Sequence, residues 1–282
     1  MAETWTVLRI LEWTTGYFRE RSIESARLDA ELLLADVLDL DRVGLYLHFD
    51  RPLEPDELKP YRELVKRRAT HEPLAYIRGE TEFWSLPFKV SPAVLIPRPD
   101  TEILVEEALS YLGDSGRILD IGLGSGAVAV ALAHERPGTF VDGVDISSEA
   151  VALANENAQL NGVAERVDFQ VNDLNAFSGG PYDLIVSNPP YIPQADIAGL
   201  MPEVREFEPM AALDGGADGL DAYRAILCQA PAALNDGGGL LVEIGIDQAA
   251  AVQQLFSEAG FVDIRLRDDY SGIPRVVSGR IK

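Results

Sequence analysis

The sequence predicts an α/β protein in which a mostly parallel, seven-stranded sheet follows a small bundle of helices. From Arg117 onward, short apolar runs alternate with stretches of helical periodicity, which is typical of βα units and of a parallel sheet covered on both faces. Residues 1–75 show helical periodicity alone, and residues 76–100 are rich in proline and in short β-like runs. We therefore expect an N-terminal helical bundle (1–75), a hairpin-like linker (76–100) and an α/β domain (101–282).

Four apolar patterns predict the helices of the bundle. The first runs from about Trp5 to Phe18, and the second and stronger one runs from Ala26 to Leu38. A short third helix is expected at 43–47, and a fourth runs from Pro55 to Thr70 with a basic end. A bundle of this kind is either a structural cap or a unit that recognises a partner, and its pattern leaves both interpretations open.

The linker ends in the segment from Ile96 to Glu102, directly before the α/β domain. Thr101 is expected to cap a helix that covers about 103–112. Arg98 and Glu102 either line a ligand site or serve in capping and ion pairing; the sequence favours neither role over the other.

Repeated βα units make up the rest of the chain. Helices are predicted at 126–135, 148–160, 220–234 and 247–259, and strands are predicted at 117–121, 139–145, 166–171, 182–187, 239–244, 261–267 and 274–281. The last two strands are close enough to form a hairpin, which makes the final strand antiparallel. The gap at 192–219 is the one long loop, and a loop of that length inside a compact domain is usually functional.

Composition excludes several classes of protein. The net charge of −22 disfavours a protein that binds phosphate backbones, although residues 1–75 contribute only −4 of it. A single cysteine excludes an internal disulfide and fits a reducing compartment, and the three histidines show no metal-ligand spacing. There is no secretory signal pattern, and no apolar run approaches the ~20 residues of a membrane span. We expect a cytoplasmic protein without a metal and without membrane attachment.

A glycine-rich loop follows the first strand of the α/β domain. It runs from Asp120 through Gly122, Leu123, Gly124, Ser125 and Gly126 into the next helix. Glycines at such a turn let the backbone approach a ligand, and the helix N-terminus supplies N–H donors. A dinucleotide fingerprint has the spacing G-x-G-x-x-G, so the spacing G-x-G-x-G here disfavours a nicotinamide cofactor.

Acidic residues follow the next two strands. Asp145 ends the second strand, where a carboxylate can accept both hydroxyls of an adenosine ribose, although a position beside a helix N-cap explains it equally well. At the third strand end, Asp173 or the backbone is placed to hydrogen-bond an adenine ring, and Leu174 is placed to pack on it. Ligands of open α/β sheets bind at these carboxyl ends.

The fourth strand ends in Asn188-Pro189-Pro190-Tyr191. Because prolines lack a backbone N–H, the strand cannot continue its pairing there. The side-chain carbonyl of Asn188 and the backbone carbonyl of Pro189 then supply two acceptors, and Tyr191 supplies an aromatic face. This set suits a planar –NH2 group, such as a side-chain amide or the exocyclic amine of a base.

These motifs together resemble a known family. Their order is similar to that of class I methyltransferases that use S-adenosylmethionine. The segments 96–102, 120–126 and 188–192, together with Glu203-Val204-Arg205, Glu208-Pro209 and Asp218-Gly219-Leu220, resemble the release factor glutamine N5-methyltransferases over essentially the whole chain. Leu123 departs from that family's pattern, in which a small polar residue is more common, and Ser85 stands where glycine is usual.

The resemblance implies a Rossmann-like class I methyltransferase domain that transfers a methyl group from S-adenosylmethionine, leaving S-adenosylhomocysteine. The implied substrate is the glutamine of the Gly-Gly-Gln motif in class I peptide chain release factors, methylated at its side-chain amide nitrogen (N5) in translation termination. The implied catalytic residues are Asn188, Pro189 and Tyr191, and Pro190 joins them in binding the substrate. Asn188 also belongs to the implied cofactor site, whose other members are Gly122, Leu123, Gly124, Ser125, Gly126, Asp145, Asp173 and Leu174.

Two other functions are compatible with parts of this pattern. Adenine-N6 methyltransferases hold an exocyclic –NH2 group with the same four residues, but they need a basic track to reach a base, which this acidic chain lacks. A non-catalytic module that binds an adenosyl ligand would keep Asp145 and the glycine loop without needing Asn188 and Tyr191. We expect a monomeric protein methyltransferase, with the helical bundle recognising the release factor and no direct binding of DNA.

Overall fold

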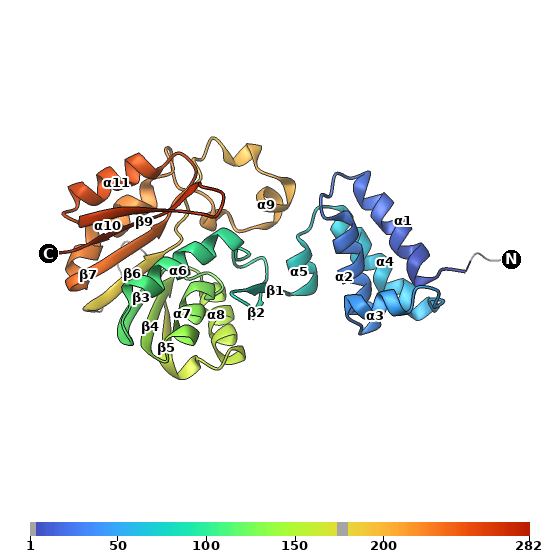
Figure 1. Cartoon of the computed structure of the whole chain (residues 1–282). Coiled ribbons are helices and arrows are strands. Elements are labelled where there is room, and N and C mark those ends of the chain that lie inside the picture. Colours follow the sequence, from blue (N-terminus) through green and yellow to red (C-terminus); the bar gives the residue numbers. More distant parts are fainter. Residues whose placement is uncertain (1–3, 174–179) are drawn as a thin grey trace. The chain divides into compact units, whose positions relative to one another are not determined.

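The computed structural model describes residues 4–173 and 180–282, which divide into two compact units (Figure 1). The first unit comprises Met1–Gly79 and Pro202–Phe207, and the second comprises Glu80–Met201 and Glu208–Lys282. The expected division into bundle, linker and α/β domain differs from this one, because the linker is not a separate unit. Phe83 and Phe88 of the linker are buried in the core of the second unit, so most of the linker is part of that unit.

Helices form the first unit. They are α1 (Val7–Arg19), α2 (Ala26–Leu38), α3 (Arg42–Leu47), α4 (Pro55–Ala69), α5 (Leu74–Arg78) and α9 (Pro202–Phe207). The side chain of Thr6 caps α1, and Pro55 occupies the first turn of α4, where a missing N–H costs nothing. The helical bundle expected from the sequence is thus present, and α2 has the predicted bounds.

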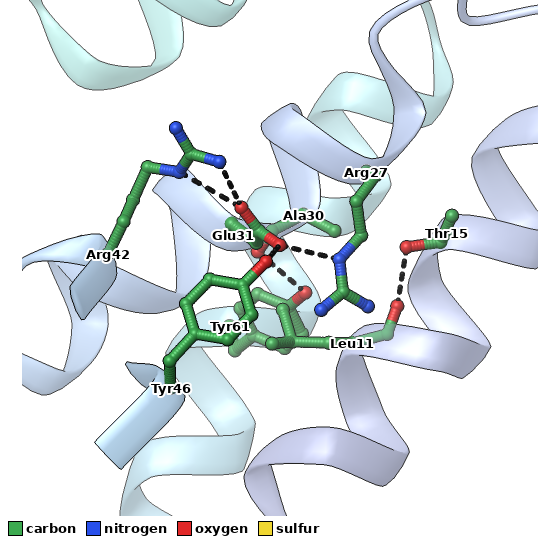
Figure 2. Close-up of polar contacts among 8 residues, drawn as sticks. All are labelled: Leu11, Thr15, Arg27, Ala30, Glu31, Arg42, Tyr46 and Tyr61. Carbon is green, nitrogen blue, oxygen red and sulfur yellow. Dashed lines mark hydrogen bonds and ion pairs between the residues drawn. The ribbon is translucent and has the colours of Figure 1, made fainter. Parts of the chain in front are cut away.

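A buried acid ties α2 to α3 in this unit (Figure 2). Glu31 Oε1 accepts hydrogen bonds from Arg27 Nε at 2.5 Å and from the Tyr46 hydroxyl at 2.7 Å, and Oε2 accepts from Arg42 Nε and Nη2 at 2.9 and 2.8 Å. Burial opposes the charge of Glu31, but the bonds from Tyr46, Arg27 and Arg42 outweigh burial and hold its pKa below the ordinary value. Glu31 is therefore an ionised, fully satisfied link between helices.

A second ion pair in the same unit is also buried. Arg68 Nε of α4 lies 2.7 Å from Asp29 Oδ2 of α2, and both side chains are at most 3% exposed. Arg68 Nη2 also lies 3.2 Å from Glu203 of α9, which accounts for the grouping of this short helix with the bundle.

The second unit begins with the hairpin formed by β1 (Glu80–Phe83) and β2 (Leu86–Lys89). Its turn places Trp84 and Ser85 at φ 56°, a backbone region that glycine adopts more readily. The hairpin was expected, and short helices flank it. The helix α5 (Leu74–Arg78) precedes the hairpin, and η1 (Pro99–Thr101) follows it.

The sheet of the second unit has seven strands in the order β5-β4-β3-β6-β7-β9-β8. Its strands are β3 (Ser115–Ile121), β4 (Gly138–Asp145), β5 (Val167–Val171), β6 (Tyr182–Ser187), β7 (Leu234–Glu243), β8 (Val262–Asp268) and β9 (Pro274–Arg280). The pairs from β5 to β7 are parallel, and β9 is antiparallel to both of its neighbours. The predicted mostly parallel sheet with an antiparallel last strand is confirmed.

Helices cover both faces of this sheet (Figure 1). They are α6 (Glu102–Tyr111), α7 (Ala127–Glu135), α8 (Ser148–Leu160), α10 (Asp221–Ala233) and α11 (Ala249–Glu258). Two hydrophobic clusters result, one that includes α6, α7 and α8 and one that includes α10 and α11. The strand order places the neighbouring ends of β3, β4 and β6 at one edge, where a parallel sheet binds its ligands.

The segment 192–219 is not the featureless loop that the sequence suggested. It contains η3 (Ile197–Gly199), α9 and η4 (Met210–Ala212), and its two ends are joined by backbone bonds from Ile192 N–H to the Leu213 carbonyl and from Gly215 N–H to the Ile192 carbonyl. Elements this short escape prediction from periodicity, because periodicity needs several turns. No helix in the described part of the chain is long and apolar enough to cross a membrane.

Candidate active site

A cavity of about 680 Å³ opens at the carboxyl ends of β3, β4 and β6 in the second unit. Its volume is typical of a site for a small molecule or cofactor. Of the residues that the sequence singled out, the cavity is lined by Gly122, Leu123, Gly124, Ser125, Asp145, Asp173, Asn188 and Pro190. The four strand ends chosen from the sequence thus contribute to one site.

The glycine loop forms one side of the cavity. Gly122, Gly124 and Gly126 all have positive φ, between 55° and 79°, which side-chain-bearing residues rarely adopt. A Cβ on Gly126 would lie 3.1 Å from the Cβ of Ala154, so this glycine, which does not line the cavity, allows α7 and α8 to pack closely. A Cβ on Gly124 would meet nothing within 4 Å, so its backbone is open to a ligand.

Leu123 has its side chain in the hydrophobic core, where it is 5% exposed. A Cβ placed on Gly143 of β4 would lie 3.0 Å from Leu123 Cδ1, which shows how closely this leucine packs on the sheet. The backbone of Leu123 donates to the carbonyl of Val144 at 3.1 Å. The departure from a small polar residue is therefore accommodated by packing.

Asp145 fixes the loop as well as facing the cavity. Its Oδ2 accepts a hydrogen bond from the Gly124 N–H at 2.8 Å, and its Oδ1 accepts from the Ser147 N–H at 2.9 Å. A position beside a helix N-cap and a role in binding ribose are thus compatible, because each carboxylate oxygen can accept a further bond from a ligand hydroxyl.

A second carboxyl, Asp120, lies beneath the loop and is 2% exposed. Burial, with a smaller effect of the nearby charge of Asp145, raises the pKa of Asp120 to about 7, although a bond from the Ala129 N–H at 3.1 Å opposes the rise. Asp120 therefore links β3 to the first turn of α7.

Asp173 lines the cavity beyond the end of β5, and its N–H donates to Asn172 Oδ1 at 2.9 Å. The Asn172 N–H bonds the carbonyl of Asp145 at 2.9 Å, which places both strand ends at the same wall. Leu174, which the sequence placed against an adenine ring, lies outside the described residues.

Asn188 stands at the end of β6 on the cavity wall. Its Nδ2 donates to Thr101 Oγ1 at 3.1 Å, so Nδ2 is engaged away from a ligand. Thr101 occupies the N-cap position of α6, but its side chain makes no capping bond, contrary to the expectation from the sequence. The Asn188 Oδ1 has no hydrogen-bond partner within 4–173 and 180–282, so it is an available acceptor.

The other members of the Asn-Pro-Pro-Tyr segment occupy different positions. Pro190 lines the cavity, whereas Pro189 is buried and Tyr191 packs against the core cluster on the α10 and α11 side. Neither Pro189 nor Tyr191 is among the residues that line the cavity. The Tyr191 hydroxyl donates to Glu243 Oε1 at 3.3 Å.

Two residues behind this segment were missed by sequence reasoning. Glu243 ends β7 and is 2% exposed; its Oε2 is buried without a close hydrogen-bond partner among the residues that the structure describes. Gln248 donates through Nε2 to the carbonyls of Tyr191, at 2.9 Å, and of Gly219, at 3.2 Å. The sequence carried one signal for Glu243, namely an acidic residue at the end of an apolar strand. A buried glutamate rarely occurs without a partner, so such a residue is a candidate for a functional role.

Arg98 also lines the cavity and pairs with Glu208 Oε2 at 2.6 Å. Both roles considered for Arg98, site lining and ion pairing, are thus present. Glu102 does not line the cavity and instead accepts a bond from the Trp84 N–H at 2.8 Å, which ties the hairpin to α6.

The charge of the cavity wall is strongly negative. Arg98 is the only basic residue among the described lining residues, whose acidic members are Asp120, Asp145, Glu149, Asp173, Asp214 and Asp221. Such a wall favours a positively charged ligand and opposes a pyrophosphate or a phosphate backbone. Among the described residues, no group of three or more His, Cys, Asp and Glu side chains could hold a metal ion.

Comparison with protein families gives two matches along the chain. Residues 9–79 match the PrmC N-terminal domain, and residues 99–201 match the methyltransferase small domain. The second match covers β3 to β6 and so includes the glycine loop and Asn188.

Close relatives cover nearly the whole chain. A release factor glutamine methyltransferase of Geobacter sulfurreducens is 53% identical over 99% of this chain and 98% of its own length. Proteins of the same name from Bradyrhizobium diazoefficiens and Chlorobaculum tepidum are 47% and 41% identical, over 93% and 98% of this chain and 90% and 97% of theirs.

Solved structures share the fold at low sequence identity. A methyltransferase from Pyrococcus furiosus has a TM-score of 0.54 at 17% identity and covers 76% of this chain and 98% of its own. A ribosomal protein L11 methylase from Lactobacillus delbrueckii subsp. bulgaricus has a TM-score of 0.51 at 22% identity, over 68% of this chain and 84% of its own. The second unit therefore has a methyltransferase fold.

Proposed function

The chain belongs to the release factor glutamine methyltransferase family, and we propose that it methylates the glutamine of the Gly-Gly-Gln motif in class I peptide chain release factors. The methyl group comes from S-adenosylmethionine and is transferred to the side-chain amide nitrogen, N5. The observation that carries this proposal is the position of Asn188 on the cavity wall, with Nδ2 bound to Thr101 and Oδ1 available as an acceptor.

The cavity suits S-adenosylmethionine in charge and in volume. This cofactor supplies an electrophilic methyl group on a positively charged sulfonium, and the acid-rich wall suits that charge. Asp145 and Asp173 line the cavity, and we propose that Asp145 accepts the ribose hydroxyls and that Asp173 bonds the adenine edge. The open backbone at Gly124 lets the loop approach the cofactor closely.

The chemistry that the chain must perform is to orient a poor nucleophile. The lone pair of an amide nitrogen is delocalised into its carbonyl, so the nitrogen attacks only when it is held in the correct geometry. The Asn188 Oδ1 and the Pro189 carbonyl each accept one N–H of the substrate amide and stabilise the positive charge that develops on nitrogen. Pro190 lines the adjoining wall. Tyr191 lies behind this wall against the core cluster, so its proposed role beside the amide plane requires it to move when substrate binds.

The two alternative functions lack support in the site. A nucleic-acid substrate must bring phosphates toward a cavity whose wall carries six carboxyl groups and one paired arginine, which opposes adenine-N6 methylation. A non-catalytic module has no use for an acceptor held at the wall by a dedicated bond to Thr101. The near-full-length relatives also favour the release factor substrate.

The first unit is proposed to recognise the release factor. Its short helix α3 exposes Val43, Tyr46 and Leu47, at 64%, 46% and 75%, and apolar side chains exposed together suit a protein partner. Replacing Val43 and Leu47 with Asp should raise KM for the release factor and leave kcat unchanged, whereas Leu160→Asp in the second unit, at a residue 49% exposed, serves as the control. An unchanged KM in the double variant would assign recognition to another surface.

We further infer that the protein acts in the cytoplasm as a monomer.

The substrate is tested by transfer of a labelled methyl group. Purified class I release factor, DNA and RNA from one host are offered in parallel with labelled S-adenosylmethionine. The proposal predicts label on the Gly-Gly-Gln glutamine, and none on a factor in which that glutamine is replaced by alanine. Label on nucleic acid alone would show instead that the site serves a base.

A further inference from the structure

The side-chain amide of Gln248, at the N-cap position of α11, bonds the backbone behind the Asn-Pro-Pro-Tyr segment. Its Nε2 donates to the carbonyls of Tyr191, at 2.9 Å, and of Gly219, at 3.2 Å. Its Oε1 accepts from the Gly245 N–H at 2.9 Å, and the Tyr223 hydroxyl lies 3.2 Å from the same oxygen. Carbonyls only accept and a backbone N–H only donates, so these partners allow one orientation of the Gln248 amide.

The backbone packs closely around this amide because two of its neighbours are glycines. A Cβ on Gly245 would lie 2.9 Å from Gln248 Oε1. A Cβ on Gly219 would lie 2.6 Å from Gln248 Nε2. Both distances are too short for a carbon atom in a well-packed interior, so the place of the Gln248 amide is defined by packing as well as by hydrogen bonds.

The Asn-Pro-Pro-Tyr segment itself is stiff. The pyrrolidine rings fix the backbone φ of Pro189 and Pro190. A residue that precedes proline is restricted as well, and this applies to Asn188 and again to Pro189. A segment with so little internal freedom moves as one body, so its direction depends on how its two ends are held.

The two ends of the segment are held by different elements. At the first end, the Ser187 hydroxyl donates to the Ile121 carbonyl at 2.7 Å, where β6 pairs with β3. At the other end, the Tyr191 carbonyl accepts from Gln248. The first end is fixed by the sheet, and the second is fixed by a side chain of α11.

Gln248 also fastens the loop that follows the segment. The chain leaves the site at Ile192 and returns at Gly215, whose N–H bonds the Ile192 carbonyl at 2.9 Å. Through its bonds to Tyr191 and Gly219, the single amide of Gln248 joins the departing and the returning stretch. Loss of this amide would release both stretches from α11.

We propose that Gln248 is a positioning residue for methyl transfer, because its hold on the Tyr191 carbonyl sets the direction of the stiff segment. That direction determines where Asn188 Oδ1 and the Pro189 carbonyl meet the substrate amide. The inference rests on the proposed function, which takes these two oxygens as the amide acceptors. Gln248 is not among the described residues that line the cavity, so it acts without touching the substrate.

The effect is expected on the rate of the reaction. An amide nitrogen attacks only in a narrow range of geometry, and a displacement of about 1 Å at the reacting groups can cost about 10²-fold in rate. The cofactor residues proposed at the ends of β3 and β4 are not bonded to Gln248, so the affinity for the cofactor should change little.

The test replaces Gln248 with methionine, which has a similar length and no donor. The Gln248 side chain makes no capping bond to α11, so the start of that helix should stay intact. We expect kcat for release factor methylation to fall about 10- to 100-fold. KM for the release factor and the affinity for S-adenosylhomocysteine should stay within about threefold of the wild-type values. Calorimetry should still find one cofactor site per chain, which a loss of folded protein would reduce.

Two further variants complete the test. Gln254→Met is the matched control in the same helix, because Gln254 is exposed and donates to Glu258 Oε1 at 2.8 Å on the surface. It should keep the wild-type kcat. Gln248→Asn keeps the amide but is shorter by one methylene, so it cannot reach the Tyr191 and Gly219 carbonyls and should be slow as well.

Two outcomes overturn the inference. A Gln248→Met enzyme with wild-type kcat would remove Gln248 from this role. A Gln248→Met enzyme that loses affinity for S-adenosylhomocysteine as strongly as it loses kcat would show that Gln248 supports the whole site and not the direction of one segment. If Gln248→Met fails to fold, Gln248→Asn decides by the same two measurements. Failure of the proposed function is a separate result, in which the wild-type protein transfers no methyl group to the release factor.

Discussion

Two buried glutamates, one in each unit, differ in how their charge is satisfied. Glu31 in the helical unit is surrounded by Arg27, Arg42 and Tyr46, and its pKa is lowered (Figure 2). Glu243 beside the cavity receives a bond from Tyr191 and shares the influence of Arg275 with two aspartates, and burial raises its pKa to about 7. Both acids are at most 2% exposed, but the side chains that cover Glu31 are partly exposed arginines, whereas burial dominates at Glu243.

The comparison separates an acid that stabilises a fold from one that is poised to change its charge. Where donors replace the lost water, as at Glu31, the carboxylate stays ionised and links helices. Where donors are few, as at Glu243, ionisation costs free energy and the group titrates near neutral pH. Buried acids with raised pKa values occur preferentially at functional sites, which agrees with the bond that Glu243 accepts from Tyr191 of the Asn-Pro-Pro-Tyr segment.

The largest effect is expected at Asn188, which lines the cavity. Asn188→Ala removes the acceptor for the substrate amide and should lower kcat by about 10²- to 10³-fold. The affinity for S-adenosylhomocysteine, measured by calorimetry, should stay within about threefold of the wild-type value. Equal losses of affinity and rate would show that Asn188 holds the cofactor rather than the amide.

Glu31→Ala should destabilise the helical unit without slowing the reaction. It leaves two guanidinium groups without their carboxylate, and because both are partly exposed we expect the free energy of unfolding to fall by about 2–3 kcal/mol. Denaturant unfolding of the full chain measures the loss. Glu63→Ala, which breaks an exposed ion pair with Lys66 in α4, is the control and should cost less than about 0.5 kcal/mol.

The two acids should respond to pH with opposite signs. The folded pKa of Glu243 lies above its ordinary value of 4.5, so wild-type stability decreases as pH rises from about 4.5 to 7. Glu243→Gln should therefore gain about 1–3 kcal/mol over the wild type between pH 5 and 8. The pKa of Glu31 is lowered, so its contribution is present above its ordinary value and is lost as pH falls through the folded pKa.

Glu31→Gln is the matched variant for this comparison, and it should be less stable than the wild type at pH 7, with a difference that shrinks in acid. Denaturant unfolding at pH 5 and pH 8 measures both variants. The same sign of pH response in the two variants would contradict the distinction between the acids.

Tyr191→Phe should produce the smallest effect. It removes the hydroxyl that bonds Glu243 and lowers its pKa, so the pKa of Glu243 should rise. The midpoint at which Glu243 titrates, followed by NMR of its carboxyl carbon, should then move to higher pH by less than about one unit. An unchanged midpoint would show that the Tyr191 hydroxyl does not stabilise the Glu243 carboxylate.

Local sequence patterns predicted much of the fold, because much of it is determined locally. The bounds of α2 followed from its apolar spacing, and the end of β6 followed from two prolines that cannot pair. The order β7-β9-β8 was not predicted, because no local sequence pattern indicates that the last strand lies between two earlier strands.

Site residues were predicted only where a predicted strand ends in an acidic residue, in glycines or in an asparagine followed by prolines. Asn188, Asp145 and the glycine loop met that condition. Thr101 was given a capping role by its position, yet its hydroxyl bonds Asn188, which lies 87 residues later in the chain. Glu243 accepts a hydrogen bond from Tyr191, which lies 52 residues earlier in the chain. Such contacts depend on how the elements pack and not on the spacing of residues in the sequence.

A direct titration of Glu243 tests most directly whether the two buried acids differ. The carboxyl carbon of Glu243 is followed by NMR against pH and is assigned by its loss in Glu243→Gln. The account predicts a midpoint of about 7 for Glu243 and a midpoint below the ordinary value for Glu31. A midpoint for Glu243 at or below 4.5 would contradict the account.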